Sequence, residues 1–307
     1  MKKSGKLVRL IHNPTAGEGA HSRKIITHLI SSHGYNCQYS SSKKKLLKAI
    51  NPDTEFIAIA GGDGTIRKTI MKLLGKKLKY KRPIALLPFG TANNIATSLG
   101  IPENAHENIA SWARYHLKKF DVGQVTGMGK TAYFIESFGF GLFPKLMKTL
   151  KMRDTTENKT AEDEFKMALS VLQKITAEYP SVPCKIELDN KVIEQDCILV
   201  EVMNISSLGP HLQLSADADP GDGLFDVVVV SARQRAQMER YVAKKTVIEN
   251  PKFTIKAFRT KSLKITWLGK DVHVDDEVVK NYDGSTLKVS VLDSLLEIVT
   301  DKPAKPT

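Results

Sequence analysis

Cysteine is scarce in this chain. Only Cys37, Cys184 and Cys197 occur among 307 residues, and they lie far apart in the sequence. None of the short spacings that mark metal-binding cysteines is present. A disulfide-stabilised secreted domain and a cysteine-based zinc module are therefore excluded. We expect the three thiols to be reduced and mostly buried.

Long hydrophobic runs are also absent. No segment approaches the roughly 18 consecutive apolar residues that a membrane-spanning helix needs. The basic start, Met1–Lys6, leads directly into a strand-like segment and lacks the apolar core of a signal peptide. These features indicate a cytoplasmic protein. With 307 residues, the chain is longer than a single hydrophobic core usually supports, so two domains are expected.

Acidic residues are missing from one strongly basic stretch, Arg67–Arg82, and the whole chain carries a net charge of +13. A second basic stretch runs from Arg233 to Lys264. Such stretches attract polyanions. Aromatic residues make up only 7% of the chain and none alternate with the basic residues, which argues against nucleic acid. The composition favours peripheral binding to an anionic membrane surface, and a solvated helix face is the alternative.

Three glycines lie within four residues after a short apolar run. The stretch Phe56–Thr65 reads as a strand that ends in Gly61, Gly62, Asp63 and Gly64, and a helical pattern follows. Glycine loops before a helix expose backbone N–H groups to phosphate. A carboxylate inside such a loop would repel phosphate, so Asp63 predicts nucleotide with Mg²⁺. The alternative is an ordinary turn between a strand and a helix.

The same arrangement occurs twice more in the first half of the chain. Leu7–His12 is followed by the small-residue loop Asn13–Gly19, and Pro83–Leu87 by the loop Pro88–Asn94, each before a helical pattern. Repeated strand, loop and helix units predict a parallel α/β sheet with its ligand at the carboxyl ends of the strands. We further expect a strand over Tyr35–Tyr39 and helices over 43–50 and 105–117.

From Phe120 onward, strand patterns dominate, interrupted by one long amphipathic helix that follows a Thr160 cap. The predicted strands are 122–126, 132–138, 182–188, 191–193, 198–203, 225–230, 253–258, 263–267, 272–274, 287–291 and 295–299. The sequence thus predicts a three-layer α/β nucleotide-binding domain at 1–121 and an antiparallel, β-sandwich-like domain at 122–300. Residues 301–307 read as a tail.

Five motifs in this order resemble the diacylglycerol kinase family of lipid kinases, which includes bacterial lipid kinases and sphingosine and ceramide kinases. Gly61–Thr65 resembles the glycine-rich signature of the family. Asn13–Gly17 and Leu87–Asn93 resemble its first and third nucleotide-binding loops. In the second half, Asp219–Asp226 is similar to the family's acidic turn, and Val274–Glu277 to its "D-G-E" motif. The resemblance covers most of the chain and implies transfer of the γ-phosphoryl group of ATP to a lipid hydroxyl.

The resemblance also implies roles for particular residues. Glu277 would be the base that takes the proton from the lipid hydroxyl, and Asp63 would hold the catalytic Mg²⁺. A structural Mg²⁺ or Ca²⁺ would be bound by Asp219, Asp222 and the carbonyl of Leu224, with a solvated Asp-Gly turn as the alternative. ATP would be held by Asn13, Pro14, Thr15, Ala16, Gly17, Ser40, Gly61, Gly62, Asp63, Gly64, Thr65, Gly90 and Thr91.

The sequence departs from the family pattern at three places. Arg67 and Lys68 stand where Asn-Glu is usual, Asn94 stands in place of an aspartate, and Asp276 replaces a glycine. Because missing carboxylates weaken Mg²⁺ binding, a catalytically degenerate lipid or nucleotide sensor is one alternative. An NAD kinase-like enzyme is another. The lipid acceptor is not identified by the sequence, and a homodimer is compatible with it.

Overall fold

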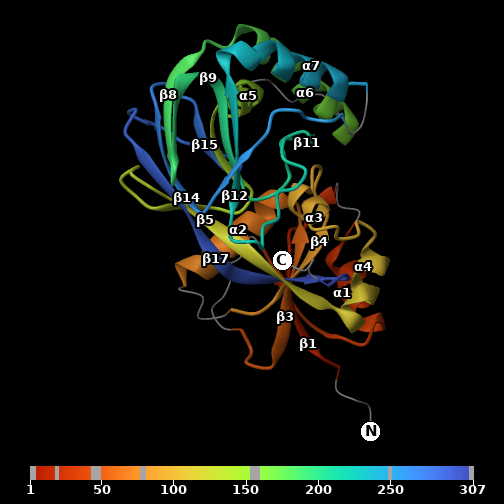
Figure 1. The fold of residues 1–307 in the computed structure, drawn as a ribbon. Helices are drawn as coiled ribbons and strands as arrows, with labels where there is room; N and C mark the ends of the chain where they lie inside the picture. Colours follow the sequence, from red (N-terminus) through yellow and green to blue (C-terminus); the bar gives the residue numbers. More distant parts are fainter. Residues whose placement is uncertain are drawn as a thin grey trace. The chain divides into compact units, whose positions relative to one another are not determined.

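The computed structural model describes residues 5–17, 21–42, 50–76, 81–152, 160–247 and 251–303. The chain divides into two compact units (Figure 1). Unit 1 comprises Met1–Phe120 and Ser294–Thr307, and unit 2 comprises Asp121–Asp293. Two strands, β5 (His116–Thr126) and β17 (Leu287–Thr300), continue from one unit into the other.

Unit 1 contains a parallel sheet with the strand order β2-β1-β3-β4-β17. The strands besides β17 are β1 (Leu7–His12), β2 (Asn36–Ser41), β3 (Thr54–Gly61) and β4 (Ile84–Pro88). Strand β3 lies in the middle, and its residues Phe56–Gly61 are buried because helices cover both faces of a parallel sheet.

The described helices of unit 1 connect these strands. They are α1 (Arg23–Ser32), α2 (Asp63–Gly75), α3 (Asn94–Ser98), α4 (Ala105–Ser111) and the 3₁₀ turn Trp112–Arg114. Side-chain caps fix two of their starts: Ser22 accepts the N–H of Ile25, and Asn104 accepts the N–H groups of His106 and Glu107. Apolar residues of α1, α4 and the 3₁₀ turn join Phe56, Leu10 and Leu87 in one core.

Unit 2 is built on antiparallel strands. Its main sheet has the order β16-β15-β7-β9-β8-β14-β17, with β12 also paired to β9 and β13, and β6 paired to β5. The bounds are β6 (Ala132–Phe134), β7 (Ser137–Gly141), β8 (Val182–Leu188), β9 (Lys191–Met203), β12 (Phe225–Ser231), β13 (Phe258–Thr260), β14 (Ser262–Trp267), β15 (Val272–Val274) and β16 (Glu277–Val278). A separate small ribbon pairs β10 (Ser207–Leu208) with β11 (Leu212–Gln213).

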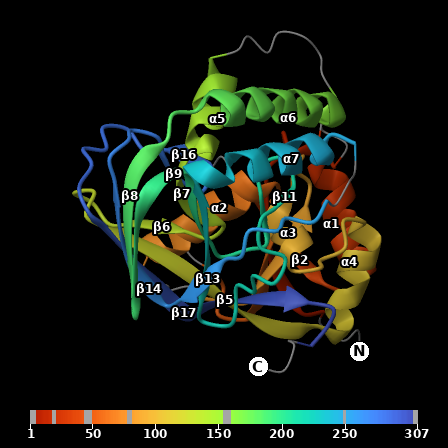
Figure 2. The same cartoon turned by 45° about the horizontal axis from the view of Figure 1, so that its top comes forward.

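Three helices of unit 2 pack together, as Figure 2 shows: α5 (Leu142–Lys151), α6 (Ala161–Glu178) and α7 (Arg235–Lys245), the last preceded by the 3₁₀ turn Ala232–Gln234. The predicted Thr160 cap of α6 is confirmed, because its side chain accepts the N–H of Asp163 and the Asp163 carboxylate accepts the N–H of Thr160. Leucines and valines of these helices and the sheet form a second core, separate from that of unit 1.

The predicted fold class is confirmed, but several predicted elements differ from the structure. The predicted strand 253–258 is wrong, since only Phe258–Thr260 pairs in that region. The predicted helix 105–117 ends early, because β5 begins at His116. Residues 294–300, placed in the second domain by sequence, belong to unit 1, where Ile298 pairs with Ile84. The predicted helix 43–50 falls almost wholly outside the described residues.

Candidate functional site

Three glycine- and polar-rich loops of unit 1 meet at the carboxyl ends of β1, β3 and β4. The N–H of Asn13 donates to the carbonyl of Ala60 at 2.9 Å, and the N–H of Phe89 donates to the carbonyl of Gly61 at 3.2 Å. The side-chain amide of Asn13 also donates to the hydroxyl of Thr65 at 3.2 Å. The predicted convergence of the three loops on one sheet edge is therefore present.

The second and third loops touch through two glycines. A Cβ on Gly62 would lie 2.8 Å from the Cα of Gly90, and a Cβ on Gly90 would lie 2.4 Å from the Cα of Gly62. Side chains at either position would force the loops apart, so glycine is required at both. Asn93 completes the third loop, because its Oδ1 accepts the N–H of Gly90 at 2.8 Å.

A cavity of about 350 Å³ opens beside these loops. Three of the predicted ATP-binding residues, Asn13, Thr15 and Thr65, line it. Lys68 and Lys72, one helical turn apart on α2, line the same cavity and give it a positive charge. Hydroxyl, amide and ammonium donors converge here, and none of the described lining residues carries a carboxylate. Such a set of groups suits a polyphosphate.

Sequence reasoning missed four residues of this cavity, namely Ser42, Lys68, Thr69 and Lys72. Ser40, predicted instead of Ser42, accepts a hydrogen bond from Arg9 at 2.6 Å. The remaining predicted ATP-binding residues lie in or beside the three loops but do not line the cavity: Pro14, Ala16, Gly17, Gly61, Gly62, Asp63, Gly64, Gly90 and Thr91. Alternation along β2 could have indicated that Ser40 and Ser42 share a face.

Asp63 has a contact that the sequence did not predict. Its Oδ2 accepts the N–H of Asn94 at 2.8 Å, and its Oδ1 accepts the N–H of Ile95 at 3.2 Å. The carboxylate thus caps the start of α3 and ties the second loop to the third. A carboxylate offers about four lone-pair directions, so this cap and a hydrated Mg²⁺ carried by ATP fit together.

The described residues of the basic stretch Arg67–Arg82 lie in different surroundings, and the membrane role of this stretch stays a prediction. Arg67 is only 7% exposed, and Lys68 and Lys72 line the cavity. Arg82 donates to the carbonyls of Thr54, Lys81 and Pro52. Residues 77–80 lie outside the described residues.

In the second basic stretch, Arg233–Lys264, some basic side chains also bind other groups of the protein. Arg235 donates to the carbonyl of Tyr179 at 2.6 Å, and Lys264 pairs with Glu187 at 3.4 Å.

In unit 2, the predicted catalytic motif comprises the end of β15, the two-residue turn Asp275–Asp276 and Glu277, the first residue of β16. Asp275 is buried and has a φ of 50°, and its carboxylate accepts the N–H groups of Ile135, Glu136 and Ser137. Asp276 does not have a positive φ, and it is exposed together with Glu277. The three acidic residues therefore differ: Asp275 is buried and holds the turn, whereas Asp276 and Glu277 are exposed to solvent.

A buried pair, His273 and Glu201, contacts the backbone of this turn. His273 Nε2 lies 2.9 Å from Glu201 Oε1, and His273 Nδ1 lies 2.7 Å from the carbonyl of Asp275. Burial alone would lower the pKa of His273, but the charge of Glu201, its hydrogen bond and the Asp275 carbonyl together raise that pKa. Gly139 makes room for the carboxylate, because a Cβ there would lie 2.1 Å from Glu201 Oε2.

The predicted structural metal loop is closed by its own side chains. The carboxylate of Asp219 accepts the N–H of Gly221 at 3.0 Å, and that of Asp222 accepts the N–H of Leu224 at 2.9 Å. Arg259 also forms an ion pair with Asp222. No cluster of three or more acidic, histidine or cysteine side chains arranged for a metal occurs among the described residues. With a guanidinium on one predicted ligand, this loop does not fit the metal.

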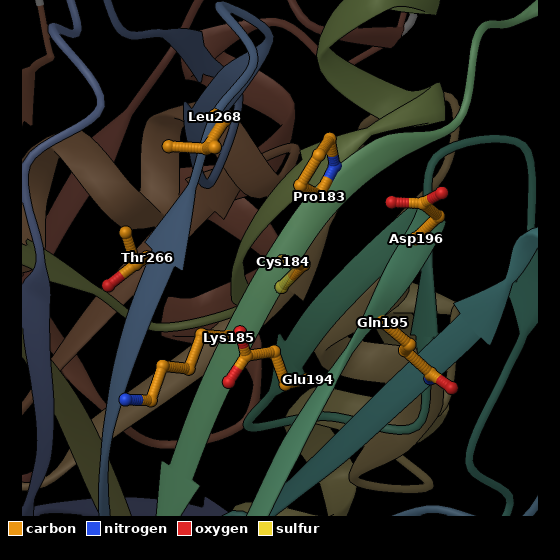
Figure 3. Close-up of a pocket in the computed structure, with 8 residues that line it drawn as sticks. All are labelled: Pro183, Cys184, Lys185, Glu194, Gln195, Asp196, Thr266 and Leu268. Carbon is orange, nitrogen blue, oxygen red and sulfur yellow. The ribbon is translucent and has the colours of Figure 1, made fainter.

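Another cavity of unit 2, of about 380 Å³, lies over β8, β9 and β14 and contains none of the predicted site residues (Figure 3). Its lining mixes Lys185 with Glu194 and Asp196, so it has no dominant charge. Cys184 in its wall and Cys197 are both buried and form no disulfide, as predicted, whereas Cys37 is half-buried. No helix in the described part of the chain is long and apolar enough to cross a membrane.

The fold thus defines a two-domain α/β plus β protein, in which the parallel unit carries a cavity whose lining suits a polyphosphate. The sequence comparisons are more specific. Residues 7–125 match the diacylglycerol kinase catalytic domain, and residues 150–300 match the YegS C-terminal NAD kinase beta sandwich-like domain. The first part of the chain therefore belongs to the diacylglycerol kinase catalytic-domain family, and the two matched domains together span most of the chain.

The chain is also similar to curated relatives in sequence and to solved structures in fold. The chain is 26% identical to a diacylglycerol kinase of Bacillus subtilis (strain 168) over 248 residues, which cover 76% of this chain and 77% of that protein. It is 24% identical to one of Staphylococcus carnosus (strain TM300) over 242 residues, covering 76% and 75%. A diacylglycerol kinase structure from Bacillus anthracis str. Sterne, 21% identical, superposes with a TM-score of 0.68 over 96% of this chain and 97% of that chain.

Proposed function

We propose that this protein is an ATP-dependent kinase that phosphorylates the hydroxyl of a diacylglycerol-like lipid. Membership of the family supports kinase chemistry on lipids. The observation that carries the ATP part is the cavity beside the three loops, whose lining donors, including Lys68, suit a chain of phosphates. The family's relatives carry diacylglycerol kinase names, which supports the choice of acceptor.

In the proposed reaction, Asn13, Thr15, Thr65 and Lys68 orient the phosphates of ATP. A Mg²⁺ ion carried by the nucleotide, within reach of Asp63, would neutralise charge on the transferring phosphoryl group. Glu277 accepts the proton of the lipid hydroxyl. The lipid oxygen then bonds to the γ-phosphorus while the bond from that phosphorus to the bridging oxygen breaks, and ADP leaves.

Phosphate transfer from radiolabelled ATP to a panel of extracted lipids tests this proposal, with NAD as the control acceptor. We expect labelled lipid and no labelled NAD. An NAD kinase-like activity is the second candidate, because residues 150–300 match a domain family that resembles the beta sandwich of NAD kinases. Labelled NAD without labelled lipid would establish that candidate instead.

Lack of transfer to every acceptor, with ATP still bound, would establish a nucleotide sensor. The charge at Lys68 and the amide at Asn94 favour that third outcome, because neither supplies the carboxylate that the family pattern has there. The same panel therefore separates all three functions when ATP binding is measured in parallel.

A further inference from the structure

A groove of unit 2 combines clustered lysines with exposed apolar side chains. It has a volume of about 710 Å³ and belongs to neither the nucleotide cavity nor the metal-like loop. Its walls come from the end of α5, from the segment just before β15, and from β16 with the loop that follows it. The lining residues are Lys148, Lys151, Met152, Lys270, Val278, Val279, Lys280, Asn281, Tyr282 and Asp283.

The charge of this groove is unbalanced. Among the described residues that line it, four are lysines and only Asp283 is acidic. Lys148 is partly neutralised, because it pairs with Asp271 at 2.7 Å. Lys151, Lys270 and Lys280 are exposed and form no ion pair within the described part of the chain. Within the described part of the chain, the groove thus presents three lysines without an ion-pair partner to solvent.

The same groove is apolar between these charges. Val278, Val279 and Tyr282 are half-buried, and Met152 at the rim is 87% exposed. A methionine side chain that is so exposed contributes no hydrophobic burial to the stability of the protein core. Lysine side chains can lie along apolar surface while their ammonium groups reach anionic headgroups, and an exposed apolar side chain among them can enter the acyl boundary.

We propose that this groove docks on a membrane leaflet that contains anionic phospholipids. The charge pattern selects the phosphate groups, and Met152 with the apolar lining contacts the acyl chains. Val278 in the groove directly follows Glu277 in β16, so a docked membrane would present its lipids beside the proposed base. This last consequence rests on the proposed function, whereas the docking itself does not.

Vesicle sedimentation with the full-length protein tests the docking. The vesicles contain phosphatidylcholine alone or with phosphatidylglycerol, and neither nucleotide nor turnover is needed. Each lysine near an anionic surface contributes roughly fivefold to binding, so Lys151→Gln, Lys270→Gln and Lys280→Gln together should weaken binding to the anionic vesicles about 100-fold. The matched control combines Lys252→Gln, Lys256→Gln and Lys261→Gln, which remove three exposed charges elsewhere on unit 2.

The control variant should lose less than about fivefold. Equal losses in the two triple variants would overturn the groove assignment, because they would show a response to total charge alone. Equal binding of the wild-type protein to neutral and anionic vesicles would also overturn it. Thermal unfolding of each variant verifies that binding is compared between folded proteins.

A fluorescent reporter supplies a second readout. Both natural tryptophans, Trp112 and Trp267, are buried, so Met152→Trp introduces the single exposed indole of the described chain. Its emission should shift to shorter wavelength with anionic vesicles and be quenched by brominated acyl chains. An unchanged spectrum at saturating vesicle concentration would overturn the proposal. Labelled-lipid formation is measured separately, so a failed docking test and a failed kinase assay remain distinguishable.

Discussion

Asp63 shows how one side chain can serve both the fold and the proposed chemistry. Its two oxygens accept the N–H groups of Asn94 and Ile95, so the carboxylate holds the third loop against the second. This contact was not predictable from sequence, because the partners lie 31 and 32 residues away and no local pattern connects them. The substitution Asp63→Asn keeps the size of the side chain, but it is therefore expected to weaken the contact between the two loops as well as cation binding.

Asp63→Asn should reduce both stability and phosphoryl transfer. The amide group that replaces one oxygen meets a backbone N–H, so we expect a loss of about 1–3 kcal/mol in the free energy of unfolding, and turnover below detection. Urea unfolding and the radiolabelled-ATP assay measure the two effects. Asp53→Asn, at an exposed position, is the control. Unchanged stability would contradict the capping role, and wild-type turnover would contradict the assignment of the loop.

The buried pair of His273 and Glu201 makes stability depend on pH in a defined direction. Since the folded-state pKa of His273 is raised above 6.5, its protonated form contributes stability that is fully present below pH 6.5. That contribution is lost as pH rises through the raised pKa. Glu201→Gln removes the attraction and leaves the burial, so breaking the pair should cost about 3–5 kcal/mol at acidic pH.

Urea unfolding of the wild-type protein and Glu201→Gln across pH tests this direction. The difference in free energy of unfolding should be largest below pH 6.5 and should narrow as the pH rises. A difference that instead widens with pH would mean that His273 is neutral in the folded protein. Glu187→Gln, which changes a partly exposed ion pair, should show little pH dependence and is the control.

At the scale of elements, the sequence was most informative where an apolar run ends in glycines. Strands β1, β3 and β4 were predicted because burial and turn chemistry agree there. The predicted strand 253–258 failed because its apolar residues pack without a partner strand: Phe253 contacts Tyr241, and Ile255 is buried in a loop. Alternating burial alone cannot distinguish these two cases.

Helix α2 lines the cavity with two lysines, which its apolar pattern does not predict. The pattern identifies the face toward the core, but it does not show that the opposite side borders a cavity with Asn13 and Thr15. Lys68 and Lys72 share that side because they are four residues apart. The departure from the family's acidic residue at position 68 thus places a cation where phosphate is expected.

Lys68→Ala and Lys72→Ala should each weaken ATP binding about 10- to 100-fold, because each removes a charge-assisted contact to phosphate. Lys68→Glu, which restores the family's charge, should weaken binding further. Isothermal titration with ATP measures these affinities. Lys76→Ala, at the exposed end of the same helix, should bind ATP normally. If all three alanine variants bind like the wild type, the phosphates do not lie in this cavity.

At the scale of the whole molecule, the proposed chemistry is divided between two units with separate cores. The three loops proposed to bind nucleotide belong to unit 1, and Glu277, the first residue of β16, belongs to unit 2. The sequence motifs predicted that nucleotide binding and the base would lie in different domains, because each motif is a short local pattern of residues. The contacts of Asp275 with Ile135–Ser137 span about 140 residues and were invisible for that reason.

This division predicts that changes at Glu277 separate catalysis from nucleotide binding. Glu277→Gln keeps the size and hydrogen bonding of the side chain but cannot accept a proton, so turnover should fall roughly 10²- to 10⁴-fold. ATP affinity should stay unchanged, because the nucleotide loops lie in the other unit. Initial rates with lipid acceptor and titration with ATP measure the two quantities.

Asp276→Gly is the matched control within the same turn. The left-handed residue of the turn is Asp275, and Asp276 does not have a positive φ, so the turn does not require the family's glycine at position 276. Turnover of Asp276→Gly should therefore be at least that of the wild type. If Asp276→Ala is inactive while Glu277→Gln remains active, Asp276 is the base, and the exposed carboxylate of Glu277 has no part in proton transfer.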